Sequence, residues 1–179
     1  VLYGAVSGYL GGRADRMLMG VVDILYAVPF MFVVIILLVL FGRNIVILFV
    51  ALGAVQWLTM ARIVRGQVLS IKQREFVEAA RVCGAGPLAV VFRHLLPQTA
   101  GPVIVYTTLT VPAVILQESF LSFIGLSVQY QGRNLDSWGS LVHYGVQALG
   151  QDGAMSWLLV WPSAAMVLTL FSLNCLGDG

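Results

Sequence analysis

The chain has 179 residues, of which 59% are apolar and only 10% are charged, and its net charge at pH 7 is +2. Soluble domains are usually about 25% charged and about 45–50% apolar. One globular core of this length could not bury so much apolar surface, which excludes a soluble fold. The low charge also excludes a disordered chain, because too few charged groups remain to keep it solvated. The composition therefore indicates a membrane protein.

The first ten residues are apolar but too short to cross a bilayer, since ten helical residues rise only about 15 Å. The chain starts without Met in the middle of an apolar run, so we expect the end of a truncated helix here. Gly4, Gly8 and Gly12 recur at every fourth position. This spacing favours the close approach of a neighbouring helix, whereas the pair Gly11-Gly12 equally favours a helix end that enters a turn.

Four uncharged stretches follow that are long enough to cross a bilayer as helices. A hydrocarbon core of about 30 Å needs about 20 helical residues, and about 17–25 are tolerated. The stretches are continuously apolar and do not alternate, which predicts helices and not the strands of a barrel. The predicted spans are residues 24–41, 45–61, 99–117 and 157–177. Trp57, Trp138, Trp157 and Trp161 fit anchoring at the membrane interface, and we expect an outer loop between Trp138 and Trp161.

Basic residues near the helix ends predict the orientation, because cytoplasmic flanks carry an excess of Lys and Arg. If the spans alternate across the membrane, eight basic residues fall on one side, and only Arg43 and Arg133 fall on the other. We therefore expect residues 62–97 and the C-terminus on the cytoplasmic side. The eight cytoplasmic residues are Arg13, Arg16, Arg62, Arg65, Lys72, Arg74, Arg81 and Arg93.

Residues 62–97 form the one internal segment with the polarity of water-exposed protein, and it carries six basic and two acidic side chains. Residues 75–82 are good helix formers, and the 3 and 4 spacing lets Phe76, Ala79 and Ala80 share one face.

Glycine and proline residues mark the expected helix ends in the rest of this segment. Gly84 is expected to end the first helix, and Pro87 suits the first turn of a second helix. Pro97 marks the beginning of the next membrane segment. Two interpretations remain: a solvated loop with snorkelling Arg side chains, or a docking surface for a cytoplasmic partner.

The spacing of residues within this segment resembles the EAA loop of ABC-importer permeases. That pattern is Glu-Ala-Ala-x3-Gly-x9-Ile-x-Leu-Pro, and Glu78, Ala79, Ala80, Gly84 and Pro97 stand at its fixed positions. His94 replaces the Ile. An Arg-His-Leu-Leu-Pro ending is familiar in the peptide-transport branch, so the departure indicates a subfamily.

The resemblance extends over residues 1–179, to the second, C-type permease subunit of the oligopeptide/dipeptide (peptide/nickel) family. It is nearest to the oligopeptide member, with dipeptide, nickel or glutathione permeases as alternatives. The segments that carry it are Gly8-Tyr-Leu-Gly-Gly12, Pro29-Phe-Met-Phe32, Ala61-Arg-Ile-Val-Arg-Gly-Gln67, Glu118-Ser-Phe-Leu-Ser-Phe-Ile-Gly-Leu126, Ser137-Trp-Gly139 and Asn174-Cys-Leu-Gly-Asp-Gly179. The implied fold class is all-α: a polytopic transmembrane helical bundle of the type I ABC-importer permease fold, with about five of six helices present and the first partial. On this basis we expect a chain truncated at both ends.

The resemblance also implies partners and a division of labour. The permease is not an enzyme: two cytoplasmic ATPase subunits would bind ATP and Mg²⁺, and no phosphate-binding Gly-x4-Gly-Lys-Ser/Thr loop occurs in this sequence. A homologous second permease subunit would complete a heterodimer in the bacterial inner membrane. A peptide-binding protein outside would deliver the substrate. We expect contact with lipid and none with nucleic acid.

Within residues 62–97, the resemblance implies an ATPase-coupling role for Glu78, Ala79, Ala80, Gly84 and Pro97. Glu78 has two interpretations, an ion pair to the ATPase or favourable electrostatics at the start of its helix. Glu118 is the ionisable residue nearest to a membrane run. It has either a structural role at the interface or a cavity-lining or gating role.

Other functional classes find less support in the sequence. A secondary transporter or channel would be expected to place ionisable residues near the bilayer midplane, and the four predicted spans have none. A membrane enzyme would need a catalytic constellation near one face, and none is visible. Cys83 and Cys175 lack the spacing of a metal site, and His94 and His143 fall on opposite sides of the predicted membrane, so we expect no bound metal.

Overall fold

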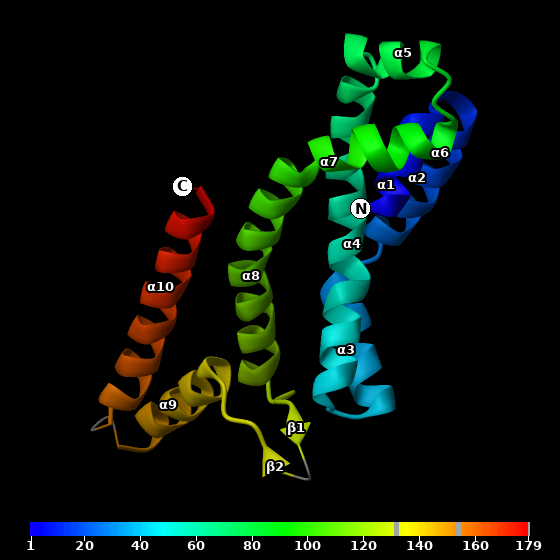
Figure 1. Ribbon diagram of the computed structural model, residues 1–179. Helices are drawn as coiled ribbons and strands as arrows, with labels where there is room; N and C mark the ends of the chain where they lie inside the picture. Colours follow the sequence, from blue (N-terminus) through cyan, green and yellow to red (C-terminus); the bar gives the residue numbers. More distant parts are fainter. Residues whose placement is uncertain (131–132, 153–154, 179) are drawn as a thin grey trace. The chain divides into compact units, whose positions relative to one another are not determined.

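The computed structural model describes residues 1–130, 133–152 and 155–178, which divide into two compact units (Figure 1). Unit 1 comprises Val1–Pro29 and Ala54–Thr107, and unit 2 comprises Phe30–Gly53 and Thr108–Gly179. Helices α4 and α8 each contribute one part to both units. The elements are α1 Leu2–Leu10, α2 Gly12–Ala27, α3 Phe30–Phe41, α4 Ile45–Ile71, α5 Glu75–Val82, α6 Pro87–Ala89, the π-helical η1 Val90–Leu95, α7 Leu96–Gln98, α8 Ala100–Phe123, β1 Gln129–Tyr130, β2 Arg133–Asn134, α9 Trp138–Asp152 and α10 Trp157–Asp178.

Three helices in the described residues, α4, α8 and α10, are long and apolar enough to cross a membrane, which confirms three of the four predicted spans. Both α4 and α8 continue past the predicted ends at residues 61 and 117. Charge marks where a chain leaves hydrocarbon, but it does not end the backbone hydrogen bonding of a helix.

The prediction of one helix over residues 24–41 is wrong. Helix α2 ends at Ala27, α3 begins at Phe30, and the two are bent by 71° at this break. Val28 has extended backbone angles, with φ −77° and ψ 128°. The cause is Pro29, because its ring disfavours helical angles at the preceding residue and its nitrogen carries no hydrogen to donate.

In unit 1, the glycines near the N-terminus serve both of the purposes left open by the sequence. A Cβ on Gly4 would collide with the carbonyl of Ala61, and one on Gly8 would lie 3.0 Å from the carbonyl oxygen of Arg65, so α1 packs closely on α4. Gly11 and Gly12 have φ of 64° and 58° and form the turn into α2. Only glycine adopts such angles without a steric cost.

Two apolar clusters hold unit 1 together. One joins α1, α4, α5 and η1 through buried Ala5, Val64, Val68, Val77, Val90, Val91 and Leu95. The other joins α2 and α4 through Met19, Val22 and Leu58, with Tyr3 and Trp57 packed against it edge to face at a ring distance of 5.3 Å. The short helix α5 is therefore attached to the rest of unit 1 by apolar packing.

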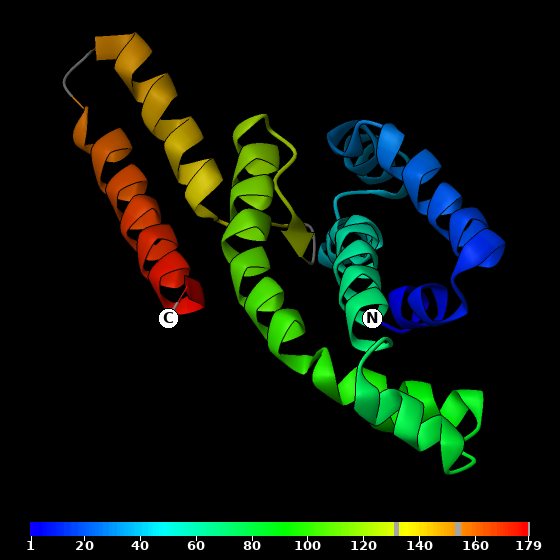
Figure 2. The ribbon, with the colours of Figure 1, turned by 90° about the horizontal axis from the view of Figure 1, so that it is seen from above.

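In unit 2, buried side chains of α3, α4, α8 and the segment before β1 form a third cluster. Helices α9 and α10 pack against each other as a helical hairpin (Figure 2). The cluster consists of Val34, Leu38, Leu48, Ala51, Leu52, Leu121 and Val128. The antiparallel hairpin of β1 and β2 is attached to the α3–α4 connection, since the Gln129 N–H donates to the Arg43 carbonyl at 2.6 Å.

The expectation of an outer loop between Trp138 and Trp161 is wrong for most of that stretch. Residues Trp138–Asp152 form helix α9. Gly145 permits its contact with α10, because a Cβ there would lie 2.7 Å from the Cα of Leu159. The three glycines of α9 lower its helix propensity, so close packing stabilises a helix that the local sequence does not favour.

Candidate functional site: the 62–97 segment and a carboxylate-lined cavity

Helix α5 begins after Arg74, which has extended backbone angles and makes no side-chain cap. Glu75 and Glu78 lie in its first turn and Arg81 lies in its last. Both placements suit the helix dipole, because carboxylates stabilise the positive N-terminal end and a guanidinium stabilises the negative C-terminal end.

Gly84 ends this helix as the sequence predicts. Its φ is 85°, its N–H donates to the Arg81 carbonyl at 3.0 Å, and the Ala85 N–H donates to the Ala80 carbonyl at 3.0 Å. This pair of bonds is a Schellman motif, which satisfies the last carbonyls of the helix and requires a left-handed residue after it. The turn at Gly84 therefore has one fixed shape.

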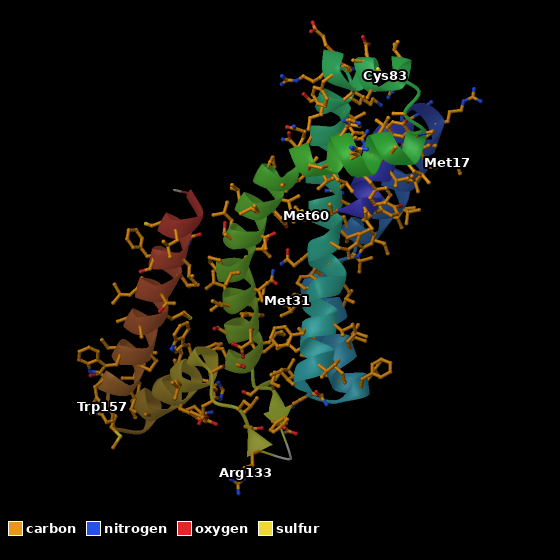
Figure 3. The ribbon with its side chains drawn as sticks, in the orientation of Figure 1. Met17, Met31, Met60, Cys83, Arg133 and Trp157 are labelled. Carbon is orange, nitrogen blue, oxygen red and sulfur yellow. The ribbon has the colours of Figure 1, made fainter. Side chains whose placement is uncertain are left out.

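One side of α5 is buried and the opposite side faces outward. Val77 is 0% exposed and belongs to the apolar cluster with Val64 and Val68 on α4. Glu78, Ala79 and Gly84 are exposed, and Ala80 is half-buried. Figure 3 places the labelled Cys83 at the end of α5, beside this turn. Four of the five predicted residues, Glu78, Ala79, Ala80 and Gly84, thus lie on one short helix and its turn, with an accessible face.

Beyond the turn, Pro87 occupies the first turn of α6, as predicted, and the chain continues through η1 and α7 to α8. Val90, Val91 and Leu95 of η1 are buried in the cluster that contains Val77. Pro97 lies in α7, directly before α8. Helix α5 is therefore connected to η1 through packed side chains as well as along the backbone.

An ion-pair network, which the sequence alone does not reveal, joins α2 to the part of α4 that begins this segment. Arg65 donates from Nε and a terminal nitrogen to the two carboxylate oxygens of Asp15, both at 2.6 Å. Ser7 Oγ donates to the same carboxylate at 2.6 Å, and Lys72 Nζ donates to the Gly8 carbonyl at 2.7 Å. The Asp15 side chain is only 7% exposed. The sequence signal for this network is weak, because Asp15 lies among other charged residues of α2 and Arg65 is fifty positions away.

A second, more exposed pair joins the same two helices. Arg62 donates to Asp23 at 2.8 Å, and its guanidinium lies 4.1 Å from the ring centre of Tyr26. The side chains of Arg62 and Asp23 are 38% and 66% exposed.

Unit 2 contains a cavity of about 450 Å³ with mostly apolar walls and two carboxylates, Glu118 and Asp136. The half-buried Glu118 lies on α8, and Ser122 Oγ, one turn further along, donates to its Oε1 at 2.6 Å. Asp136, Ser137 and Trp138 therefore line the same cavity as Glu118, a grouping that their positions in the sequence do not indicate. The remaining lining residues are Leu48, Phe49, Leu52, Val114, Ile115 and Leu141.

The described residues contain no group of three or more His, Cys, Asp or Glu side chains arranged to hold a metal ion. His143 lies on α9, where its Nε2 is 2.8 Å from Gln147 and its ring contacts those of Phe123 and Tyr144. His94 lies in η1 and is half-buried.

Long apolar helices and a short exposed helix that ends in a Schellman turn fit the permease family that the sequence resembles. Residues 1–179 match the model of the binding-protein-dependent transport system inner membrane component family, and the chain belongs to that family. It is an integral membrane protein with the helical fold of those permeases. The family inferred from the spacing of residues 78–97 is thereby confirmed.

Curated relatives match nearly the whole chain. It is 49% identical over 178 residues to the oligopeptide transport system permease protein OppC of Haemophilus influenzae, covering 99% of this chain and 55% of that protein. It is 50% identical over 169 residues to OppC of Escherichia coli K12, covering 94% and 54%. It is 44% identical over 179 residues to the dipeptide transport system permease protein DppC of Bacillus subtilis, covering 100% and 54%. The chain spans about half the length of the curated relatives it matches.

Proposed function

We propose that this chain belongs to a permease subunit that imports peptides, in particular oligopeptides. The observation that carries the proposal is the match of residues 1–179 to a binding-protein-dependent transport family, together with about 50% identity to oligopeptide permeases. The subunit itself is not catalytic. Two cytoplasmic ATPase subunits bind ATP and Mg²⁺, a homologous permease subunit completes the pore, and an external binding protein delivers the peptide.

In this proposal the 62–97 segment receives the mechanical work of the ATPases. The exposed face of α5, with Glu78 and Ala79, lies in a groove of one ATPase subunit, with Ala80 and Gly84 at its margin. Apolar packing of Val77 against η1, and the fixed turn at Gly84, support a rigid transfer of movement toward α8. That movement switches the pore between inward- and outward-facing states, as expected of a packed element with two discrete arrangements.

The proposed orientation follows from the distribution of basic residues. The 62–97 segment and the C-terminus lie in the cytoplasm, and the β1–β2 hairpin lies outside the inner membrane. Eight basic residues on one side against two on the other support this assignment. Glu118 then belongs to the outer part of α8, where it lines the substrate path or takes part in gating.

Peptide-stimulated ATP hydrolysis tests the proposal. The permease would be purified with its partner permease and ATPase subunits, reconstituted in liposomes, and supplied with the binding protein and a tetrapeptide. ATP hydrolysis is expected to rise several-fold with peptide, and labelled peptide is expected to accumulate. Stable co-purification of all subunits without stimulation by any peptide would refute the peptide-importer function.

A dipeptide importer is the second candidate, because the chain is also 44% identical to a dipeptide permease. Competition separates the two. If unlabelled tetrapeptide reduces uptake of labelled dipeptide and the reverse competition fails, the oligopeptide function stands. The opposite asymmetry would favour the dipeptide function.

A further inference from the structure

We propose that the cavity of unit 2 is a subsite for an ammonium group of the transported peptide, with Glu118 as its principal ligand and Asp136 and Trp138 as auxiliary contacts. The inference rests on the proposed peptide-import function and adds the chemistry by which this subunit contacts its substrate. The cavity volume of about 450 Å³ lies within the range of about 300–1,000 Å³ typical of small-molecule sites. It therefore suits one end or one side chain of a peptide, and not a whole oligopeptide.

The charge of the cavity is unbalanced. Its described lining includes the carboxylates of Glu118 and Asp136, and no Lys, Arg or His. Among the described residues, the two ion pairs involve Asp23 and Asp15 instead, and neither cavity carboxylate takes part in one. A cation that enters the cavity would meet two negative groups without displacing an internal partner.

Apolar walls strengthen this attraction. Leu48, Phe49 and Leu52 of α4 face Val114 and Ile115 of α8 across the cavity lining. Coulomb interactions grow as the effective dielectric constant falls, so a carboxylate beside such walls attracts a cation more strongly than it would in open water. The same walls suit the aliphatic part of a peptide that follows its ammonium group.

A hydrogen bond from Ser122 fixes the orientation of the Glu118 carboxylate. Ser122 Oγ donates to Oε1 at 2.6 Å, and Ser122 itself is only 2% exposed. This bond occupies one carboxylate oxygen and orients the group, while an ammonium carries three donors that can bond the remaining lone pairs. Charge-assisted hydrogen bonds of this type are roughly twice as strong as neutral ones.

The opposite wall is equally fixed. The Ser137 N–H donates to Ser140 Oγ at 2.8 Å, and the Ser140 hydroxyl donates to the Ser137 carbonyl at 2.8 Å, which shapes the chain at the start of α9. A Cβ on Gly139 would collide with the Ser119 carbonyl, so α9 lies directly against α8. The exposed Asp136 and the half-buried Trp138 both line the cavity beside this contact, and an indole ring is a side chain that binds cations by cation–π interaction. Asp136 also precedes a helix N-terminus, whose positive end offsets part of its charge, so Glu118 contributes more.

Three labelled tetrapeptides test the inference in the reconstituted complex with its binding protein. Tetra-alanine amide carries only an α-ammonium group, N-acetyl-Ala-Lys-Ala-Ala amide carries only a side-chain ammonium group, and N-acetyl-tetra-alanine amide carries neither. Uptake by Glu118→Gln is divided by uptake by the unmodified complex for each peptide, so that any preference of the binding protein cancels. The uptake ratio is expected to be about tenfold lower for a cationic peptide than for the uncharged one, equivalent to about 1.4 kcal/mol.

The pattern identifies the source of the ammonium group. A loss confined to tetra-alanine amide assigns the N-terminus, and a loss confined to the lysine peptide assigns a side chain. Glu118→Asp should recover part of the loss, Asp136→Asn should show a smaller loss, and Asp23→Asn, which removes a carboxylate outside the cavity, should not discriminate among the peptides. Equal ratios for all three peptides with Glu118→Gln would overturn the inference alone. Failure of the unmodified complex to import any of them would overturn the peptide-import function, and the inference with it.

Discussion

Unit 1 contains a buried carboxylate and unit 2 a half-buried one, and their charges are treated in opposite ways. Asp15 of unit 1 accepts two hydrogen bonds from Arg65 and one from Ser7, and its charge is neutralised within the chain. Glu118 of unit 2 accepts one hydrogen bond from the neutral Ser122 and lines a cavity whose described walls carry no cation. An internally paired carboxylate fixes helices to each other, whereas one without an internal cation is available to a ligand.

The contrast between the two carboxylates matches two different roles that we propose for the two units. The fixed carboxylate lies in the unit that contains α5, for which we propose a mechanical role. The available carboxylate lies in the unit for which we propose substrate contact. Variants in unit 1 should therefore affect all substrates alike, and variants at the cavity should affect them according to charge.

Removing the cation from the fixed pair should have the largest effect. Arg65→Ala leaves the buried Asp15 without its ion-pair partner. The loss of one partner from a fully buried pair costs about 3–5 kcal/mol, and the 33% exposure of the Arg65 side chain lowers our expectation to about 2–3 kcal/mol. Thermal denaturation of the purified complex should show the loss as a lower midpoint.

A double-mutant cycle checks the origin of that effect. Asp15→Ala and Arg65→Ala together should cost much less than the sum of the single changes, because no unpaired charge is left. Strict additivity would contradict the assignment of a coupled pair.

The second effect concerns the turn that ends α5. Gly84→Val forces a β-branched residue into φ 85°, which costs about 1–2 kcal/mol or more, although a Cβ there would meet no atom within 4 Å. We expect membrane insertion to persist and uptake of all three tetrapeptides to fall about tenfold or more. Uptake per inserted complex measures this.

Gly84→Asn is the matched control, because Asn tolerates left-handed angles better than other residues with a Cβ. It should retain much more uptake than Gly84→Val. Normal uptake by Gly84→Val would remove the coupling role from this turn, and a loss that depends on peptide charge would contradict the separation of roles between the units.

The sequence correctly predicts the end of α5 at Gly84, and the reason is local. Gly84 and Pro87 act on the backbone within one or two residues, so the sequence alone predicts where the helices end and begin. Pro29 acts just as locally, yet residues 24–41 were predicted as one span, because absence of charge reports compatibility with lipid and not continuity of a helix. Helix α9 is not predicted because its helix propensity is weak. Gly139 and Gly145 allow it to pack closely on its neighbours, and this packing stabilises it.

The surroundings of Asp15 and Glu118 are not predictable from the sequence, for a different reason. Asp15 pairs with Arg65 only because α2 packs on α4, and Glu118 lines the same cavity as Asp136 only because the start of α9 packs on α8. Such contacts depend on how helices pack, which charge counts and periodicity do not determine. The family motif located α5, whereas the cavity required three-dimensional structure.

Adding a cation to the cavity should convert the available carboxylate into a paired one. Leu141 lines the cavity from α9 and is 39% exposed, so Leu141→Lys can place an ammonium group there without burying it fully. We expect uptake of the cationic tetrapeptides to fall about tenfold relative to the uncharged one, equivalent to about 1.4 kcal/mol. Competitive uptake assays with the three peptides measure this.

Leu141→Met is the control, because it keeps similar volume and adds no charge. If both variants reduce uptake of every peptide equally, shape and not charge governs the cavity, and the contrast between Glu118 and Asp15 has no functional meaning.

The exposed pair between Arg62 and Asp23 should show the smallest effect. It joins the same helices as Arg65 and Asp15 at a similar distance, 2.8 Å, but its side chains are 38% and 66% exposed. Exposed pairs contribute about 0.2–1 kcal/mol and are screened by salt, so Arg62→Gln should lower the denaturation midpoint slightly, and less at high ionic strength. Arg65→Ala, measured beside it, should lose far more at either ionic strength. Equal losses in the denaturation midpoint for the two variants would mean that the number of ion pairs, and not the burial of their charges, fixes α2 to α4. Asp15 and Glu118 would then differ only in that Glu118 lacks a cationic partner.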